Sequence, residues 1–210
     1  MVAYGRLYPA ASHPYIDPGK SVFTAVRMSP IRFKPPGFDP APYLDRIRRG
    51  EAACADLGIR IDREGVWHYR GSPIGRQAMA RLFAAILHRL PDGSYWLVTP
   101  AEQGSIEVED VPFVAVELRS TGEGRDRRLA FRTNLDEWVT AGPEHPIRLG
   151  AADAQGAQAP YVMVRDGLEA RLARPVFYEL IELAEPGEGD ELAIWSDGMR
   201  FSLGQTGETA

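Results

Sequence analysis

The sequence predicts an α+β protein made of two duplicated α/β units with mainly antiparallel sheets. Short strands with alternating apolar residues are separated by glycine-rich turns, and amphipathic helices lie between them. The same order of elements occurs twice. In the second half, five residues repeat residues of the first half at a spacing of 95 positions, where chance gives about one or two such identities: Arg70/Arg165, Arg76/Arg171, Ala78/Ala173, Ile86/Ile181 and Pro91/Pro186.

The chain divides into an arm, two units and a tail. Residues 1–37 are too rich in proline for a stable helix or strand, which predicts a flexible arm. Met28 lies within this arm and is an alternative start of translation to Met1. We expect the first unit over 38–118, the second over 119–204, and a tail over 205–210.

The first unit begins with a short helix after Asp39, which ends at Gly50. Apolar and polar residues alternate in 59–61 and in 66–69, and Arg63-Glu64-Gly65 lies between these two runs. This pattern is typical of a hairpin of two strands. Apolar residues from Ile74 to Leu90 recur at helical spacing and predict one helix. Strands are then expected at 94–98, 106–109 and 112–118.

The second unit is expected to repeat this order. After a strand at 127–133, Leu135-Asp136-Glu137-Trp138 is interpreted as a short helix. Strands follow at 147–149 and 161–164, and Asp166-Gly167 is a strong hairpin signal. Pro175 opens a second long helix, as proline does in a first turn. Strands at 191–195 and 199–203 complete the unit.

Composition excludes several classes of function. Residues 1–37 carry five basic side chains and one acidic, so the 24 basic and 29 acidic residues of the whole chain leave an acidic body. This argues against nucleic-acid binding. No apolar run reaches the roughly 20 residues that span a bilayer, so we expect no membrane insertion. The lone Cys54 allows neither an intramolecular disulfide nor a cysteine-based metal cluster. Without a secretory signal, the expected location is the cytoplasm.

Arginines gather at the turn before the first long helix. Arg70, Ser72 and Arg76 flank glycines at a predicted helix N-terminus, where free N–H groups and the helix dipole favour an anion. Arg165 and Arg171 occupy the equivalent places in the second half. The alternative is a plain hairpin turn whose arginines pair with carboxylates. A phosphate-binding Walker loop is excluded, because it needs a lysine and the body has none.

Carboxylates and a Thr-Asn pair form the other candidate sites. Glu102, Glu109 and Asp110 could hold a metal ion or act as acid and base, although charges on a solvated edge strand are the commoner explanation. Thr133 and Asn134 could contact a ligand or cap a helix. The histidines lack the spacing of metal ligands, so no metal site is expected, and no motif indicates a particular cofactor.

Several longer runs resemble the bacterial family known as domain of unknown function 1285. They include residues 65–76, Leu97-Val98-Thr99-Pro100 with Glu102, Val108-Glu109-Asp110 with Pro112-Phe113, Thr133-Asn134, 160–162, 164–165, 167–171 and Trp195-Ser196. The resemblance covers residues 38–204. It implies a C-terminal unit similar to pleckstrin-homology domains, a ligand groove between the units that could hold a nucleotide, and a place in signal transduction. It implies no established activity.

Three hypotheses of function follow. The first is a non-enzymatic protein that senses a nucleotide-like or other anionic small molecule in a polar groove between the units. The second is a metal-dependent enzyme acting on a phosphorylated or nucleotide substrate, and the third is a protein-interaction scaffold. No catalytic residue is assigned. The expected ligand-binding residues are Arg70, Ser72, Arg76, Thr99, Glu102, Glu109, Asp110, Thr133, Asn134, Arg165 and Arg171.

Overall fold

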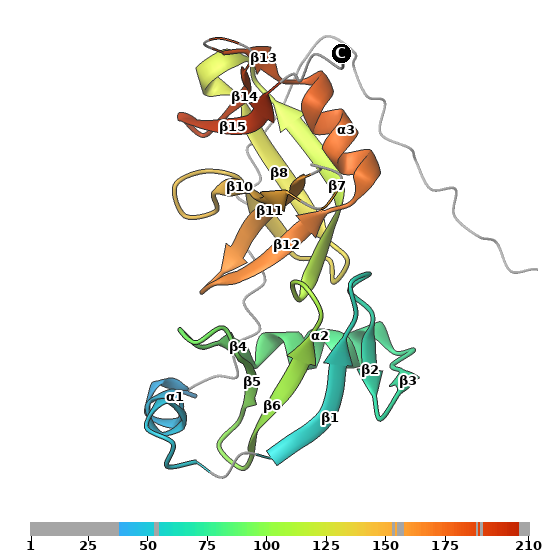
Figure 1. Cartoon of the computed structure of the whole chain (residues 1–210), viewed down its shortest axis with the longest axis vertical. Coiled ribbons are helices and arrows are strands. Elements are labelled where there is room, and N and C mark those ends of the chain that lie inside the picture. Colours follow the sequence, from blue (N-terminus) through green and yellow to red (C-terminus); the bar gives the residue numbers. More distant parts are fainter. Residues whose placement is uncertain are drawn as a thin grey trace, which may run out of the picture.

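A computed structural model describes residues 38–52, 55–152, 154, 158–187, 189 and 191–205. The expected arm, Met28, Cys54 and the tail beyond residue 205 lie outside the described residues. Within them, the structure confirms an α+β fold of two units, which are stacked along the long axis of the molecule (Figure 1).

The first unit contains one six-stranded sheet in the order β3-β2-β1-β6-β5-β4. Only β1 and β6 are parallel within it. Helix α2 packs against this sheet, where the ring of Phe83 stacks on that of Trp67. The elements are α1 (Ala41–Arg48), β1 (Ala55–Ile61), β2 (Trp67–Tyr69), β3 (Ser72–Pro73), α2 (Gln77–Ala85), β4 (Leu87–Arg89), β5 (Tyr95–Val98) and β6 (Gln103–Val108).

The second unit contains another six-stranded sheet, in the order β10-β11-β12-β7-β8-β9, and a small antiparallel sheet, β13-β14-β15. Again only one pair of strands, β12 and β7, is parallel. Helix α3 lies beside β7 (Figure 1). The elements are β7 (Phe113–Thr121), η1 (Gly124–Asp126), β8 (Arg128–Thr133), β9 (Trp138–Thr140), β10 (Ile147–Ala152), β11 (Gln158–Arg165), β12 (Leu168–Leu172), α3 (Arg174–Glu182), β13 (Glu185–Pro186), β14 (Glu191–Ser196) and β15 (Met199–Gln205).

Two predicted helices are wrong in extent or kind. The helix expected to reach Leu90 ends at Ala85, because 87–89 form β4 and pair with β5. The helix expected at 135–138 is a turn followed by β9. There the Thr133 hydroxyl accepts hydrogen bonds from the amides of Leu135 and Glu137. Asp136 has a φ of 63°, which ends any right-handed helix at that point.

The repeat is present in the order of elements, but its register is not constant. The β2–β3 turn has φ angles of 48° at Arg70 and 81° at Gly71, and the β11–β12 turn has 43° at Asp166 and 79° at Gly167. Both have the two positive φ angles of a type I′ turn. Arg70 is therefore matched by Asp166 and not by Arg165. The expected equivalence of Arg70 and Arg165 is wrong by one residue.

One hydrophobic core runs through both units. Trp67 and Ala80 of the first unit belong to the same buried cluster as Phe113, Phe131 and Val164 of the second. A smaller cluster under α1 contains Ile47, Leu90, Trp96 and Val98. The chain passes from the first sheet to the second between Val108 and Phe113. The boundary expected at 118/119 falls inside β7, which pairs with β12 and β8 of the second sheet.

The helices of the described residues are also too short, or not apolar enough, to cross a membrane.

Candidate functional site

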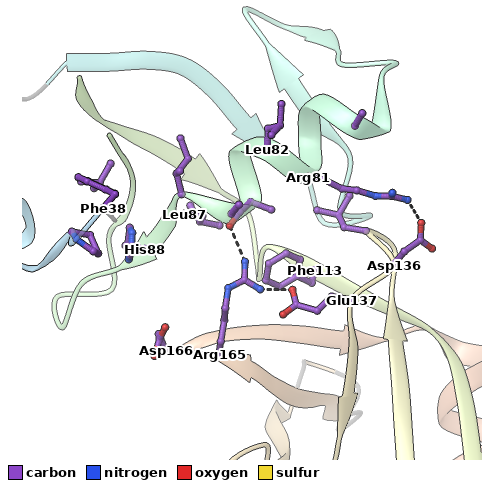
Figure 2. Close-up of a pocket in the computed structure, with 17 residues that line it drawn as sticks. Phe38, Arg81, Leu82, Leu87, His88, Phe113, Asp136, Glu137, Arg165 and Asp166 are labelled. Carbon is purple, nitrogen blue, oxygen red and sulfur yellow. Dashed lines mark hydrogen bonds and ion pairs between the residues drawn. The ribbon is translucent and has the colours of Figure 1, made fainter. Parts of the chain in front are cut away.

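A cavity of about 550 Å³ lies between the two units. The first unit contributes Phe38, α2 and β4, and the second contributes Phe113, the turn at 135–137, and Arg165 with Asp166. In Figure 2, Phe38 and His88 lie on one side of Arg165, and Arg81 and Asp136 lie on the other. Such a concave space between two units is a common place for a small-molecule site.

The wall from α2 is apolar because that helix carries apolar side chains on opposite faces. Ala80 and Ala84 are buried in the core. Ala78, Leu82 and Ala85, which are spaced four and three residues apart, are on the side of the helix that lines the cavity, and Ala84 borders it as well. Leu82 is 53% exposed and is the bulkiest apolar side chain that α2 brings to the cavity. The cavity therefore presents a leucine side chain to any molecule that enters it.

Arg165 joins the two units at the centre of the cavity. Its guanidinium forms an ion pair with Glu137 and donates a hydrogen bond of 2.8 Å to the carbonyl oxygen of Ala84 (Figure 2). It also lies 5.2 Å from the centroid of the Phe113 ring. The Ala84 carbonyl belongs to the last turn of α2, where a cation is favoured by the helix dipole. Arg165 thus caps a helix of one unit from a strand of the other.

A second ion pair, between Arg81 and Asp136, lies on the other side of the cavity. The Arg81 guanidinium binds the Asp136 carboxylate, which also accepts a hydrogen bond of 2.9 Å from Arg132. Nearby, the Gln77 side-chain amide donates to the backbone oxygen of Asn134 over 2.9 Å. Both arginines of the cavity wall, Arg81 and Arg165, are therefore already paired with carboxylates of the second unit.

Asn134 fastens the two units beside the cavity. Its side-chain Nδ2 donates to the Gly65 carbonyl over 2.9 Å, and its Oδ1 accepts from the Val114 amide over 3.1 Å. Gly65 has a φ of 76°, and a Cβ atom at this residue would lie 2.7 Å from Asn134 Nδ2. Glycine is required here for both its conformation and its size. Thr133, which is fully buried, holds the turn that positions Asn134.

Asp110 and Arg171 form a separate polar contact between the units. The Tyr161 hydroxyl donates to Asp110 over 3.0 Å, and the Arg171 guanidinium lies 3.6 Å from the same carboxylate and donates to the Arg63 carbonyl over 2.5 Å. Burial and this hydrogen bond to Asp110 raise the pKa of Tyr161 above its ordinary value. Glu109 points to other partners, the Arg60 guanidinium and the Arg63 amide. The contacts of Asp110 and Arg171 therefore hold the units together outside the cavity, whereas those of Glu109 stay within the first unit.

The remaining expected site residues lie elsewhere in the first unit. The Arg70 guanidinium lies 5.1 Å from the centroid of the Tyr69 ring, and Ser72 is an exposed residue of β3. Arg76 is the N-cap residue of α2 and does not line the cavity. The Thr99 hydroxyl donates to the Glu102 carbonyl within the β5–β6 turn. Arg165 is therefore the only one of the eleven expected residues in the wall of this cavity.

The carboxylates expected to act together are far apart. Glu102 precedes β6 and Glu109 follows it, so the length of a six-residue strand, about 20 Å, separates them. Glu102 therefore shares no metal ion with Glu109 or Asp110. Among the residues that the structure describes, no group of three or more His, Cys, Asp and Glu side chains is placed to hold a metal ion.

Sequence reasoning missed most of the cavity wall. One signal was present: residues 77–85 are apolar except for Gln77 and Arg81, and a helix that is apolar nearly all round needs a partner on more than one side. Asp136 and Glu137 were assigned to a helix, and Asp166 was interpreted only as a turn residue. No local pattern indicated that these three carboxylates would line the same cavity as α2. The missed residues include Phe38, Arg81, Leu82, His88, Asp136, Glu137 and Asp166.

Comparison with known proteins identifies the family. Residues 51–111 match the family model "Domain of unknown function (DUF1285), N-terminal domain", and residues 112–203 match "Protein of unknown function (DUF1285), C-terminal domain". No curated protein matches the chain.

Two solved structures of DUF1285 family proteins are similar to this chain. The first, from Silicibacter pomeroyi DSS-3, is 44% identical, with a TM-score of 0.68 over 72% of this chain and 81% of the other. The second, from Shewanella baltica OS155, is 26% identical, with a TM-score of 0.48 over 60% of this chain and 91% of the other. Since the two family models together match well over half of its residues, the chain belongs to the DUF1285 family.

Proposed function

We propose that this protein binds a small molecule with an apolar body in the cavity between its two units. The observation that carries the proposal is a cavity of about 550 Å³ into which α2 presents the half-exposed side chain of Leu82. Full burial of a leucine side chain contributes roughly 1.5–3 kcal/mol, so covering the exposed half of Leu82 contributes about half of that. An apolar ligand would bury the exposed part of Leu82, and it could also pack against the rings of Phe38 and Phe113.

Such a ligand would contact both units at once. Leu82 and Leu87 belong to the first unit, and Phe113 and Leu135 to the second. The ion pairs Arg165–Glu137 and Arg81–Asp136 hold the two walls in place without the ligand. Little conformational order is lost when a ligand enters a preformed site, which favours binding. The proposed role is therefore that of a binding module.

The expectation of a nucleotide-like or other anionic ligand stays a prediction. In this cavity an anion would have to compete with Glu137 for Arg165, which would leave Glu137 unpaired, or with Asp136 for Arg81. A role in signal transduction, a cytoplasmic location and the absence of nucleic-acid binding also stay predictions, as do the hypotheses of an enzyme and of an interaction scaffold.

The experiment uses the neutral dye N-phenyl-1-naphthylamine, whose fluorescence rises in an apolar environment. We expect saturable binding to the full chain. Leu82→Glu should weaken it about tenfold or more, because the ligand would then cover a charge in place of a leucine. The matched control is Met79→Glu. Met79 is 42% exposed on the same helix but does not line the cavity, so this variant should bind the dye normally.

Equal dye binding by both variants and the unmodified protein would refute the proposal. Circular dichroism of each variant shows whether it keeps its fold. Both substitutions replace side chains that are largely exposed, so the fold should tolerate each of them.

A further inference from the structure

The charges in the cavity wall do not balance. The wall contains two guanidiniums, Arg81 and Arg165, and three carboxylates, Asp136, Glu137 and Asp166. Arg165 pairs with Glu137, and Arg81 pairs with Asp136. Asp166 is the acidic group that these two pairs leave over.

Asp166 has a fixed place at the rim. It is the first of two residues with positive φ in the tight turn between β11 and β12, and both of these strands belong to the six-stranded sheet. Within the described parts of the chain, its carboxylate has neither a hydrogen bond nor an ion pair. The side chain is exposed and lines the cavity. A rigid turn thus presents an unpaired carboxylate beside an apolar space.

A further arginine near this turn, Arg89, is engaged elsewhere. The Cδ atom of Arg89 comes within 3.9 Å of the Cβ position at Gly167, next to Asp166. Its guanidinium, however, lies 5.8 Å from the centroid of the Tyr95 ring. Arg89 therefore belongs to a contact with β5, and Asp166 remains open to a ligand.

We infer that the ligand carries a cationic group, an amine or an ammonium, next to its apolar body and places this group against Asp166. The inference rests on the proposed function and adds the charge of the ligand. It runs opposite to the anionic ligand expected from the sequence. Because Asp166 is exposed, water and salt screen the ion pair, so a preference of only a few fold is expected.

The test measures how octylamine, octanol and octanoate displace N-phenyl-1-naphthylamine from the full chain at neutral pH and low salt. The three probes share one apolar chain and differ in the charge of the head group. Octylamine should bind about two- to fivefold more tightly than octanol, and octanoate more weakly than octanol. The difference between amine and alcohol should shrink as salt is added.

Asp166→Asn should remove the preference for the amine and leave octanol binding unchanged. Asparagine tolerates positive φ, so the turn should persist. The matched control is Asp197→Asn. Asp197 has a φ of 49° before Gly198 in the β14–β15 turn and does not line the cavity. It removes the same charge from the same kind of turn, so the preference for octylamine should remain.

The possible outcomes separate the two proposals. If octylamine displaces the dye no better than octanol, or octanoate displaces it best, the cationic ligand is refuted and the proposed function stands. A preference for octylamine that survives Asp166→Asn refutes the role of this residue. If the dye itself does not bind, the proposed function fails and the inference fails with it.

Discussion

Replacing Gly65 by alanine should weaken the contact between the two units and destabilise the protein. The added Cβ would lie 2.7 Å from Asn134 Nδ2 and 3.0 Å from Val114 Cγ2. Real contacts of Cβ atoms are longer, so Asn134 or the turn must move. The hydrogen bond from Asn134 to the Gly65 carbonyl would then be lost.

The expected loss in the free energy of unfolding has two parts. Alanine at a φ of 76° costs about 1–2 kcal/mol. Loss of the hydrogen bond, with the Asn134 amide left part-buried and unsatisfied, costs a further 1–3 kcal/mol or so. Gly65→Ala should therefore destabilise the protein by roughly 2–5 kcal/mol. Gly71→Ala is the matched control, because Gly71 has a φ of 81° and no atom within 4 Å of its Cβ position. It should incur only the conformational cost.

The assay is unfolding in urea, followed by fluorescence and by circular dichroism. The difference between the two variants measures the contact between the units, since the effect of replacing glycine on the unfolded chain is the same in both. If Gly71→Ala destabilises the protein as much as Gly65→Ala, the contact of Gly65 with Asn134 contributes nothing and the reasoning is refuted.

Two further predictions concern ionised groups. Arg165→Met should lower the free energy of unfolding by roughly 3 kcal/mol, because Glu137 would keep its charge in a part-buried place without a partner. Adding Glu137→Gln should recover part of this loss in urea unfolding, and a double variant as unstable as Arg165→Met alone would contradict the assignment. At Asp62, burial opposes ionisation, but hydrogen bonds from the side chain of His68 and the amides of Val66 and Glu64 outweigh it, and the pKa lies below its ordinary value. A carboxyl group with a lowered pKa stabilises the fold above about pH 4 and loses this effect as the pH falls further. Asp62→Asn should therefore reduce the acid sensitivity of the unfolding midpoint between about pH 5 and pH 2, and an unchanged pH profile would show that Asp62 plays no part in it.

The fold was largely predictable because its signals are local. The alternation in 59–61 and 66–69 and the Asp166-Gly167 turn each predict a hairpin within a few residues of chain, and the structure confirms both. The end of α2 was missed because Ile86 and Leu90 fit the helical spacing, although Leu87 is the residue that is buried in β4. Periodicity does not reveal which residues find a partner strand.

The candidate site was less predictable because its contacts are distant in sequence. Asn134 binds a carbonyl 69 residues away, and Arg165 binds one 81 residues away. Both residues were expected at the site on general chemical grounds. Their partners are backbone carbonyls, which every residue has, so the sequence does not show which carbonyl each side chain binds. A one-residue difference in turn register was enough to place Asp166, and not Arg165, at the position equivalent to Arg70.

The core shared by the two units means that neither unit is an independent folding domain. A repeat whose copies pack separately can be cut, exchanged or extended copy by copy. Here Trp67 and Phe113 belong to one buried cluster, so either half on its own would expose the surface that the other half covers. The two halves match separate family models, yet their buried residues form one cluster. A substitution of a buried residue at the junction therefore changes the packing of both halves at once.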